Sequence, residues 1–128
     1  MKIIYTALFV KNREELLSKF KPKHTKVFAH HATIEWKPCD LLGIEVGREV
    51  KLKVLGRVVD DKGEALIVER DKIKKPFPHI TLSCVEGVMP AYCEEMIERA
   101  TTNNTVEIFD KPIEIALIEG YFDGVDKY

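Results

Sequence analysis

The chain has few cysteines, and their spacing is not that of a cross-linked or metal-bound domain. Cys39, Cys84 and Cys93 are three in number and include no Cys-x-x-Cys pair. An odd count without that spacing argues against a disulfide framework and against a structural zinc site. We therefore expect a protein of the reducing cytoplasm.

The sequence also lacks a long hydrophobic run, an excess of charge of one sign and a glycine-rich phosphate loop. The apolar run at residues 3–10 is too short to span a membrane and has no cleavage site, so we expect a buried strand there and no membrane association. The formal net charge of −1 argues against binding to duplex DNA. The phosphate loop of nucleotide hydrolases and the Lys-x-Asp-Gly motif of ligases are both missing.

The bulk composition predicts one folded domain. The chain is 128 residues long, with 45% hydrophobic and 32% charged residues, which is typical of a globular protein rather than a disordered one. A chain of this length supports a single core, so we expect one domain over residues 1–128 and a monomer.

A short phrase occurs twice in the chain. Residues 31–34 read His-Ala-Thr-Ile and residues 79–82 read His-Ile-Thr-Leu, each within an apolar, strand-like stretch. Side chains of a strand alternate between its two faces, so the His and Thr of each phrase point the same way, about 6.6 Å apart along the chain. Each phrase therefore predicts an imidazole beside a hydroxyl on one sheet face. The alternative is that both histidines are ordinary half-buried strand residues bonded to backbone carbonyls.

Hydrophobic patterning predicts strands and two helices in a nearly repeated order. Asn12 with Glu15 three residues later is a capping signature, and Pro22 ends the helix that follows it. Pro90 begins a second helix, which residues 101–104 break. We expect strands at residues 3–10, 27–36, 50–60, 65–69, 79–85, 106–109 and 113–121, with Pro112 between the last two.

This order predicts an α+β fold with mostly antiparallel sheets and two main helices. Each half of the chain contains one His-x-Thr strand. We therefore expect a two-lobed, pseudo-symmetric arrangement in which the motifs occupy equivalent strands and face a common cleft.

At these residues the chain resembles the 2H phosphoesterase superfamily, which is defined by two His-x-Thr/Ser motifs on strands of a two-lobed, duplicated α+β fold. Members include 2′,3′-cyclic phosphodiesterases of the RNA 2′,5′-ligase group, cyclic phosphodiesterase domains of tRNA ligases and phage proteins that cleave cyclic-nucleotide immune signals. The resemblance implies that His31 and His79 are catalytic and that Thr33 and Thr81 hold the phosphate.

These four side chains suit metal-free phosphodiester chemistry. A neutral imidazole can take a proton from an attacking water, and a protonated one can give a proton to the leaving oxygen. The hydroxyls can donate hydrogen bonds to the non-bridging oxygens. No cluster of metal-ligating residues has suitable spacing, so we expect neither a metal nor a cofactor. The sequence leaves open which histidine is the acid and which is the base.

Further residues are candidates for contact with the substrate. The aromatic side chains that could stack on a base are Tyr5, Trp36, Phe77 and Tyr121, although core packing is the commoner role for each. Lysines precede both motifs and suit an anionic ligand, and Lys75 is the candidate among them. His30 is expected on the sheet face opposite His31, in a structural role, and His24 in an exposed loop.

We therefore expect a phosphodiesterase whose substrate is a cyclic nucleotide or an RNA 3′ end that carries a 2′,3′-cyclic phosphate. Two alternatives stay open. One is an enzyme of the same chemistry that cleaves cyclic oligonucleotide signals or trims RNA ends. The other is a non-catalytic module that binds a nucleotide or an RNA end.

Overall fold

Strands make up most of the regular secondary structure in this computed structural model, which describes residues 2–128. The elements in chain order are β1 (Tyr5–Val10), α1 (Arg13–Lys19), β2 (Lys26–Val27), β3 (His31–Trp36), β4 (Glu49–Val59), β5 (Gly63–Val68), β6 (His79–Cys84), α2 (Tyr92–Thr102) and β7 (Glu107–Phe122). The α+β class, the antiparallel strands and the two helices agree with the sequence analysis.

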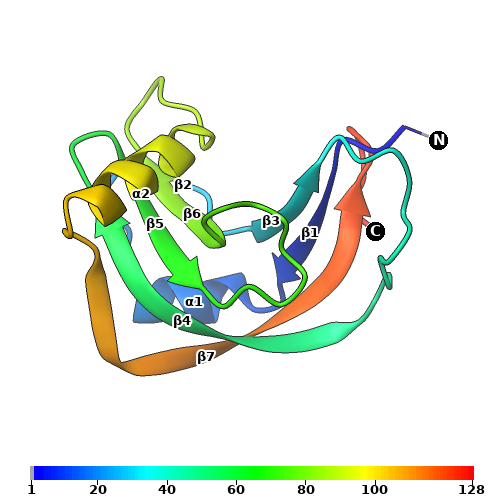
Figure 1. Cartoon of the computed structure of the whole chain (residues 1–128), viewed down its shortest axis with the longest axis horizontal. Coiled ribbons are helices and arrows are strands. Elements are labelled where there is room, and N and C mark those ends of the chain that lie inside the picture. Colours follow the sequence, from blue (N-terminus) through cyan, green and yellow to red (C-terminus); the bar gives the residue numbers. More distant parts are fainter. Residues whose placement is uncertain (1) are drawn as a thin grey trace.

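The strands form one antiparallel sheet that closes on itself. Their order is β2-β6-β3-β1-β7-β4-β5, and an additional pairing between β5 and β6 closes six of the strands into a barrel. The long strands β4 and β7 curve along one side of the molecule, and β1 and β3 lie at one end of them (Figure 1). The weakest junction of the barrel joins β3 to β6, where a single residue pair, Ala32 and Ile80, is in register.

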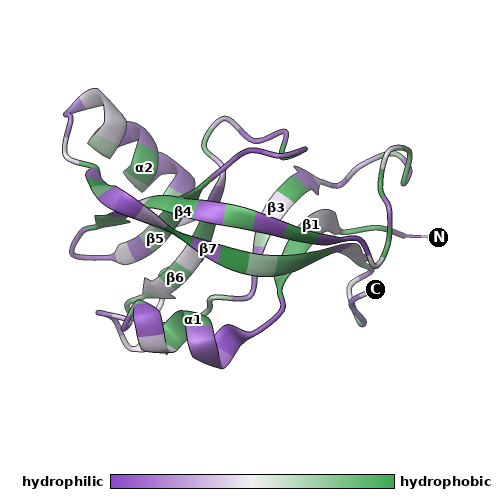
Figure 2. Cartoon of the chain, turned by 90° about the horizontal axis from the view of Figure 1, so that it is seen from below, coloured by the Kyte–Doolittle hydropathy of each residue, from purple (hydrophilic) through white to green (hydrophobic). Residues whose placement is uncertain are grey.

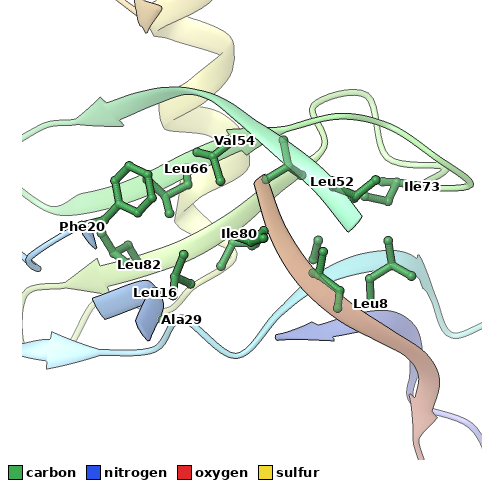
Figure 3. Close-up of a cluster of buried hydrophobic side chains, with 14 of the residues drawn as sticks. Leu8, Leu16, Phe20, Ala29, Leu52, Val54, Leu66, Ile73, Ile80 and Leu82 are labelled. Carbon is green, nitrogen blue, oxygen red and sulfur yellow. The ribbon is translucent and has the colours of Figure 1, made fainter. Parts of the chain in front are cut away.

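The interior of the barrel is the larger hydrophobic core. Leu8, Ile34, Leu52, Leu66 and Ile80 are almost fully buried there, and Figure 3 shows the inward-pointing side chains of this cluster. Removal of this much apolar surface from water is the main force that favours the closed sheet, at roughly 1.5–3 kcal/mol for each large side chain.

Helix α1 closes the core as its sequence predicts. The side chain of Asn12 accepts a hydrogen bond from the Glu15 amide at 3.1 Å, which caps the first turn. The apolar residues Leu16 and Phe20 join the barrel core, and the Phe20 ring stacks on Phe109 with 5.8 Å between centroids.

Helix α2 packs on the outside of the barrel. Its buried residues Cys93, Met96 and Ile97 contact a second, smaller cluster that includes Val58 of β4 and Ala65 of β5. In Figure 2 hydrophobic and hydrophilic residues alternate along both helix ribbons, as expected of helices with one buried and one exposed face. Among residues 2–128, no helix is both long and apolar enough to cross a membrane.

Two predicted strand boundaries are wrong. The first motif strand is divided into β2 and β3, because Ala29 has a left-handed backbone with φ of 60°. The two strands predicted around Pro112 are one strand, β7. Pro112 is tolerated there because the register between β4 and β7 shifts between Val54 and Gly56, so the strand is irregular where the proline lacks a donor.

A buried carboxylate, Glu119, ties two loops to the barrel. Glu119 accepts hydrogen bonds from the Lys72 ammonium at 2.7 Å and from the Glu45 amide at 2.8 Å, and it pairs with Arg48. These contacts hold the pKa of Glu119 below its usual value against the opposing effect of burial. The loop from 37 to 48 and the loop after β5 are thereby fixed to β7.

Candidate functional site

The two His-x-Thr motifs lie on neighbouring antiparallel strands, and their register places the four side chains together. Ala32 of β3 is paired with Ile80 of β6, and both are fully buried in the barrel core. Because side chains alternate along a strand, the residues that flank this pair point to the outer face. Each histidine therefore lies diagonally opposite the other one, across from the threonine of the other strand.

The four motif side chains line one cavity on the outer face of the barrel. Its volume is about 460 Å³, which is within the range of ligand pockets. The lining residues are Tyr5, Phe28, His30, His31, Thr33, Trp36, Lys75, Phe77, His79, Thr81, Met89, Pro90, Ala91 and Glu94. Aromatic and aliphatic side chains form most of the walls, so water is a poor competitor for hydrogen bonds at the imidazoles and hydroxyls.

The ring of His79 is oriented by a backbone contact. Its Nδ1 lies 2.7 Å from the carbonyl oxygen of Phe77, and an N–H at Nδ1 donates to that oxygen. This arrangement leaves Nε2 for the cavity. Burial lowers the pKa of His79, while the hydrogen bond to Phe77 and the charge of Glu94 act in the opposite direction.

His31 has a different environment. Its ring stacks on Tyr5 with 4.6 Å between centroids and meets the edge of Phe9 at 5.7 Å. Its Nδ1 is buried and has no hydrogen-bond partner within residues 2–128. Burial, with smaller effects of His30, Lys127 and His79, lowers the pKa of His31 to about 4. The two imidazoles are therefore inequivalent, and His79 is the more basic of them.

The hydroxyls of Thr33 and Thr81 also have different surroundings. Thr81 Oγ1 makes a long, 3.5 Å contact to the carbonyl oxygen of Pro90, just before α2. Thr33 lines the cavity from β3, where it is paired with Ala7 of β1. A weakly bound hydroxyl can turn toward a ligand oxygen at small cost.

Four of the five candidate contact residues line the cavity. Tyr5 stacks between His31 and Trp36, with 5.9 Å between the Tyr5 and Trp36 centroids. Trp36 is 54% exposed, so one side of its ring is free at the cavity mouth. Lys75 and Phe77 also line the cavity.

The fifth candidate, Tyr121, does not line the cavity. Its ring stacks on Tyr128, with 4.8 Å between centroids, and its amide and carbonyl groups pair with the backbone of the same residue. Tyr121 therefore holds the C-terminal residues against β7 and is not in a position to stack on a ligand in this cavity.

His30 corrects another expectation. Strand alternation would place it on the face opposite His31, yet it lines the same cavity. The left-handed residue Ala29 precedes it and β3 begins only at His31, so His30 is not part of a regular strand. His24 is half-buried rather than exposed, and its Nε2 lies 2.9 Å from the Asp60 carbonyl oxygen.

Most of the motif-proximal lysines are engaged elsewhere. Lys72 bonds to Glu119, and Lys74 bonds to Glu35 at 2.8 Å. Lys75 pairs with Glu94 at 2.9 Å across the cavity wall. The sequence did not predict Glu94 as a cavity residue, because its position there depends on where α2 packs. The one sequence signal for it was an acidic residue in the first turn of the predicted second helix.

The arrangement can perform proton transfer on both sides of a small ligand. Two imidazoles with lowered pKa values and two adjacent hydroxyls converge from two strands, and one cation lies at the rim. Within the described residues, no three His, Cys, Asp or Glu side chains gather as a metal-binding group. In comparisons with known proteins, no family model and no curated protein matches this chain.

Proposed function

We propose that this chain is a phosphodiesterase of the 2H type that opens a cyclic phosphodiester, most simply the 2′,3′-cyclic phosphate of a nucleotide or an RNA end, without a metal. The observation that carries the proposal is the register of Ala32 and Ile80. That pair brings two His-x-Thr motifs into one cavity in a local twofold arrangement. In this proposal β3 and β6 are the equivalent strands of a two-lobed, 2H-like fold.

The proposed reaction is an in-line attack of water on phosphorus. One neutral imidazole takes a proton from the water as the new P–O bond forms. The bond between phosphorus and the 2′ or 3′ oxygen breaks, and the other imidazole, protonated, gives its proton to that oxygen. The product is a phosphomonoester with a free hydroxyl, and proton exchange with solvent resets both imidazoles. Thr33 and Thr81 donate to the non-bridging oxygens as negative charge increases there.

The environments of the histidines support one assignment of roles. The anionic substrate favours one added proton in the cavity, and that proton goes to the more basic imidazole, His79, whose Nδ1–H already donates to Phe77. We therefore assign the general acid to His79. His31, with a pKa of about 4, is neutral at pH 7 and is assigned the general base.

The apolar walls support a substrate that carries a nucleobase. Phe28, Phe77 and the exposed ring of Trp36 border the same cavity as the motif side chains. Bases stack on aromatic side chains with little dependence on base identity, at about 1–3 kcal/mol each. A nucleotide would thus place its phosphate between the imidazoles and its base on an aromatic wall.

The test is a panel of 2′,3′-cyclic nucleotides, cyclic oligonucleotides and RNA ends, incubated with and without a chelator. We expect turnover of a cyclic phosphate at the same rate in both conditions, and loss of that turnover by about two to four orders of magnitude in His31→Ala and in His79→Ala. His24→Gln is the matched control, because His24 lies outside the cavity.

Near wild-type rates in either alanine variant would contradict the mechanism. Binding of nucleotides without turnover of any substrate would instead favour the non-catalytic binding module. Circular dichroism and thermal unfolding of each variant separate loss of chemistry from loss of fold.

A further inference from the structure

Three further side chains that can bind an anion lie at the cavity: the imidazole of His30, which lines it, and the cations Arg13 and Lys127, which are not among its lining residues. His30 lines the cavity beside His31, and it is exposed. Its imidazole is placed there by the left-handed turn at Ala29, not by the motif strand itself. Neither the His-x-Thr motifs nor the proposed reaction uses this third imidazole.

The C-terminal residues bring a lysine to the same side. Lys127 pairs with Phe122 across a short antiparallel bridge, and its ammonium lies 5.7 Å from the centroid of the Phe9 ring. The same Phe9 ring contacts His31 at 5.7 Å. The C-terminus lies beside the end of β7, the strand that pairs with β1 (Figure 1). Gly120 has no side chain at the point where the Tyr128 carbonyl oxygen approaches, so the tail can dock closely.

Arg13 adds a guanidinium from the start of α1. Its Nε donates to the Phe28 carbonyl at 2.7 Å and a terminal nitrogen donates to the Val27 carbonyl at 3.3 Å. These bonds hold the segment just before His30. Arg13 therefore positions His30 as well as contributing charge.

No carboxylate neutralises this group in the described part of the chain. Arg13, His30 and Lys127 form no ion pair there, whereas the carboxylate that lines the cavity, Glu94, is paired with Lys75. Of the acidic side chains in the tail, Asp123 accepts hydrogen bonds from two tail amides, and neither Asp123 nor Asp126 forms an ion pair with Lys127. Burial lowers the pKa of His30, and the nearby charges of Lys127 and Arg13 lower it further.

We propose that Arg13, His30 and Lys127 form a second anion subsite beside His31, which binds a phosphate group of the substrate other than the one that is opened. This inference rests on the proposed function, which places the cyclic phosphate between His31 and His79, next to the subsite. It names the substrate class as a nucleotide or oligonucleotide with at least two phosphates. Two cations and an imidazole at the edge of a cavity attract such a group, and added salt weakens that attraction.

The test measures binding without turnover. Dissociation constants of a nucleoside 3′-phosphate and the matching nucleoside 3′,5′-bisphosphate are measured by calorimetry at low salt. We expect wild-type protein to bind the bisphosphate about tenfold more tightly. Lys127→Gln and His30→Gln should each remove most of this preference and leave the affinity for the monophosphate nearly unchanged, and Lys127→Arg should retain the preference.

Lys111→Gln is the matched control, since Lys111 is an exposed lysine of β7 outside the cavity. Equal affinity of wild-type protein for the two ligands, or binding of neither, would overturn the subsite. An equal loss of affinity for both ligands in Lys127→Gln would also overturn it, because that result would mean that Lys127 attracts any anion over a distance and does not bind the second phosphate. Failure of the proposed function is separate: it would show as absence of cyclic phosphate opening in a protein that still prefers the bisphosphate.

Discussion

The assignment of His79 as general acid and His31 as general base makes a prediction that depends on the leaving group. With a pKa of about 4, His31 is protonated in about one molecule in a thousand at pH 7, so it could act as the acid only at a cost of about three orders of magnitude. His79 holds its ring with a 2.7 Å bond to the Phe77 carbonyl, which suits an imidazolium. The acid is needed only when the leaving oxygen is a poor leaving group.

The experiment compares a 2′,3′-cyclic nucleotide, whose leaving group is a sugar alkoxide, with a nucleotide 4-nitrophenyl phosphodiester, whose leaving group departs without protonation. In His79→Ala we expect kcat/KM to fall by about 10²–10⁴ for the cyclic ester but by less than about tenfold for the aryl ester. In His31→Ala we expect a fall of about 10²–10⁴ for both, because water must lose a proton in each reaction. The refuting result is an equal loss for both esters in His79→Ala, or a loss confined to the cyclic ester in His31→Ala.

Two further predictions concern stability and substrate binding. The pKa of His31 in the folded protein lies near 4, below the ordinary value of 6.5, so the unfolded chain binds a proton first as pH falls. Between pH 7 and pH 4.5, wild-type protein should therefore lose about 2 kcal/mol more of its unfolding free energy than His31→Gln, as measured by urea titration. Equal losses in the two proteins would argue against a buried neutral imidazole. Trp36→Ala should raise KM for cyclic nucleotides about tenfold with little change in kcat, and should leave KM for base-free ribose 2′,3′-cyclic phosphate unchanged; an equal rise for both would show that Trp36 does not stack on the base.

Local sequence signals predicted the elements better than their assembly. The Asn12 cap and the strand that became β4 could be predicted from the sequence, because each depends on neighbours a few residues away. Closure of the barrel depends on pairing of β5 with β6, which no local pattern encodes. Pro112 predicts a break between two strands, and that prediction is wrong because tolerance of the proline in β7 depends on the register shift against β4.

The candidate site shows the same division. Alternation along two strands was enough to predict that each histidine shares a face with its threonine, and the register of Ala32 with Ile80 brings the two pairs together. Alternation failed at His30, because the left-handed backbone of Ala29 is not readable from an alanine. Glu94 reaches the cavity only through the packing of α2 on the barrel, which is a tertiary effect.

The central claim is that His31 and His79 act on one phosphorus in one reaction. The most direct test is a double-mutant cycle on the opening of a 2′,3′-cyclic nucleotide in the presence of a chelator, with kcat/KM measured for wild-type protein, His31→Ala, His79→Ala and the double variant. Groups that act as a unit give losses that do not add. We predict that the double variant is no more than about tenfold slower than the slower single variant. Losses that multiply in the double variant, or a single variant that keeps the wild-type rate, would contradict the account.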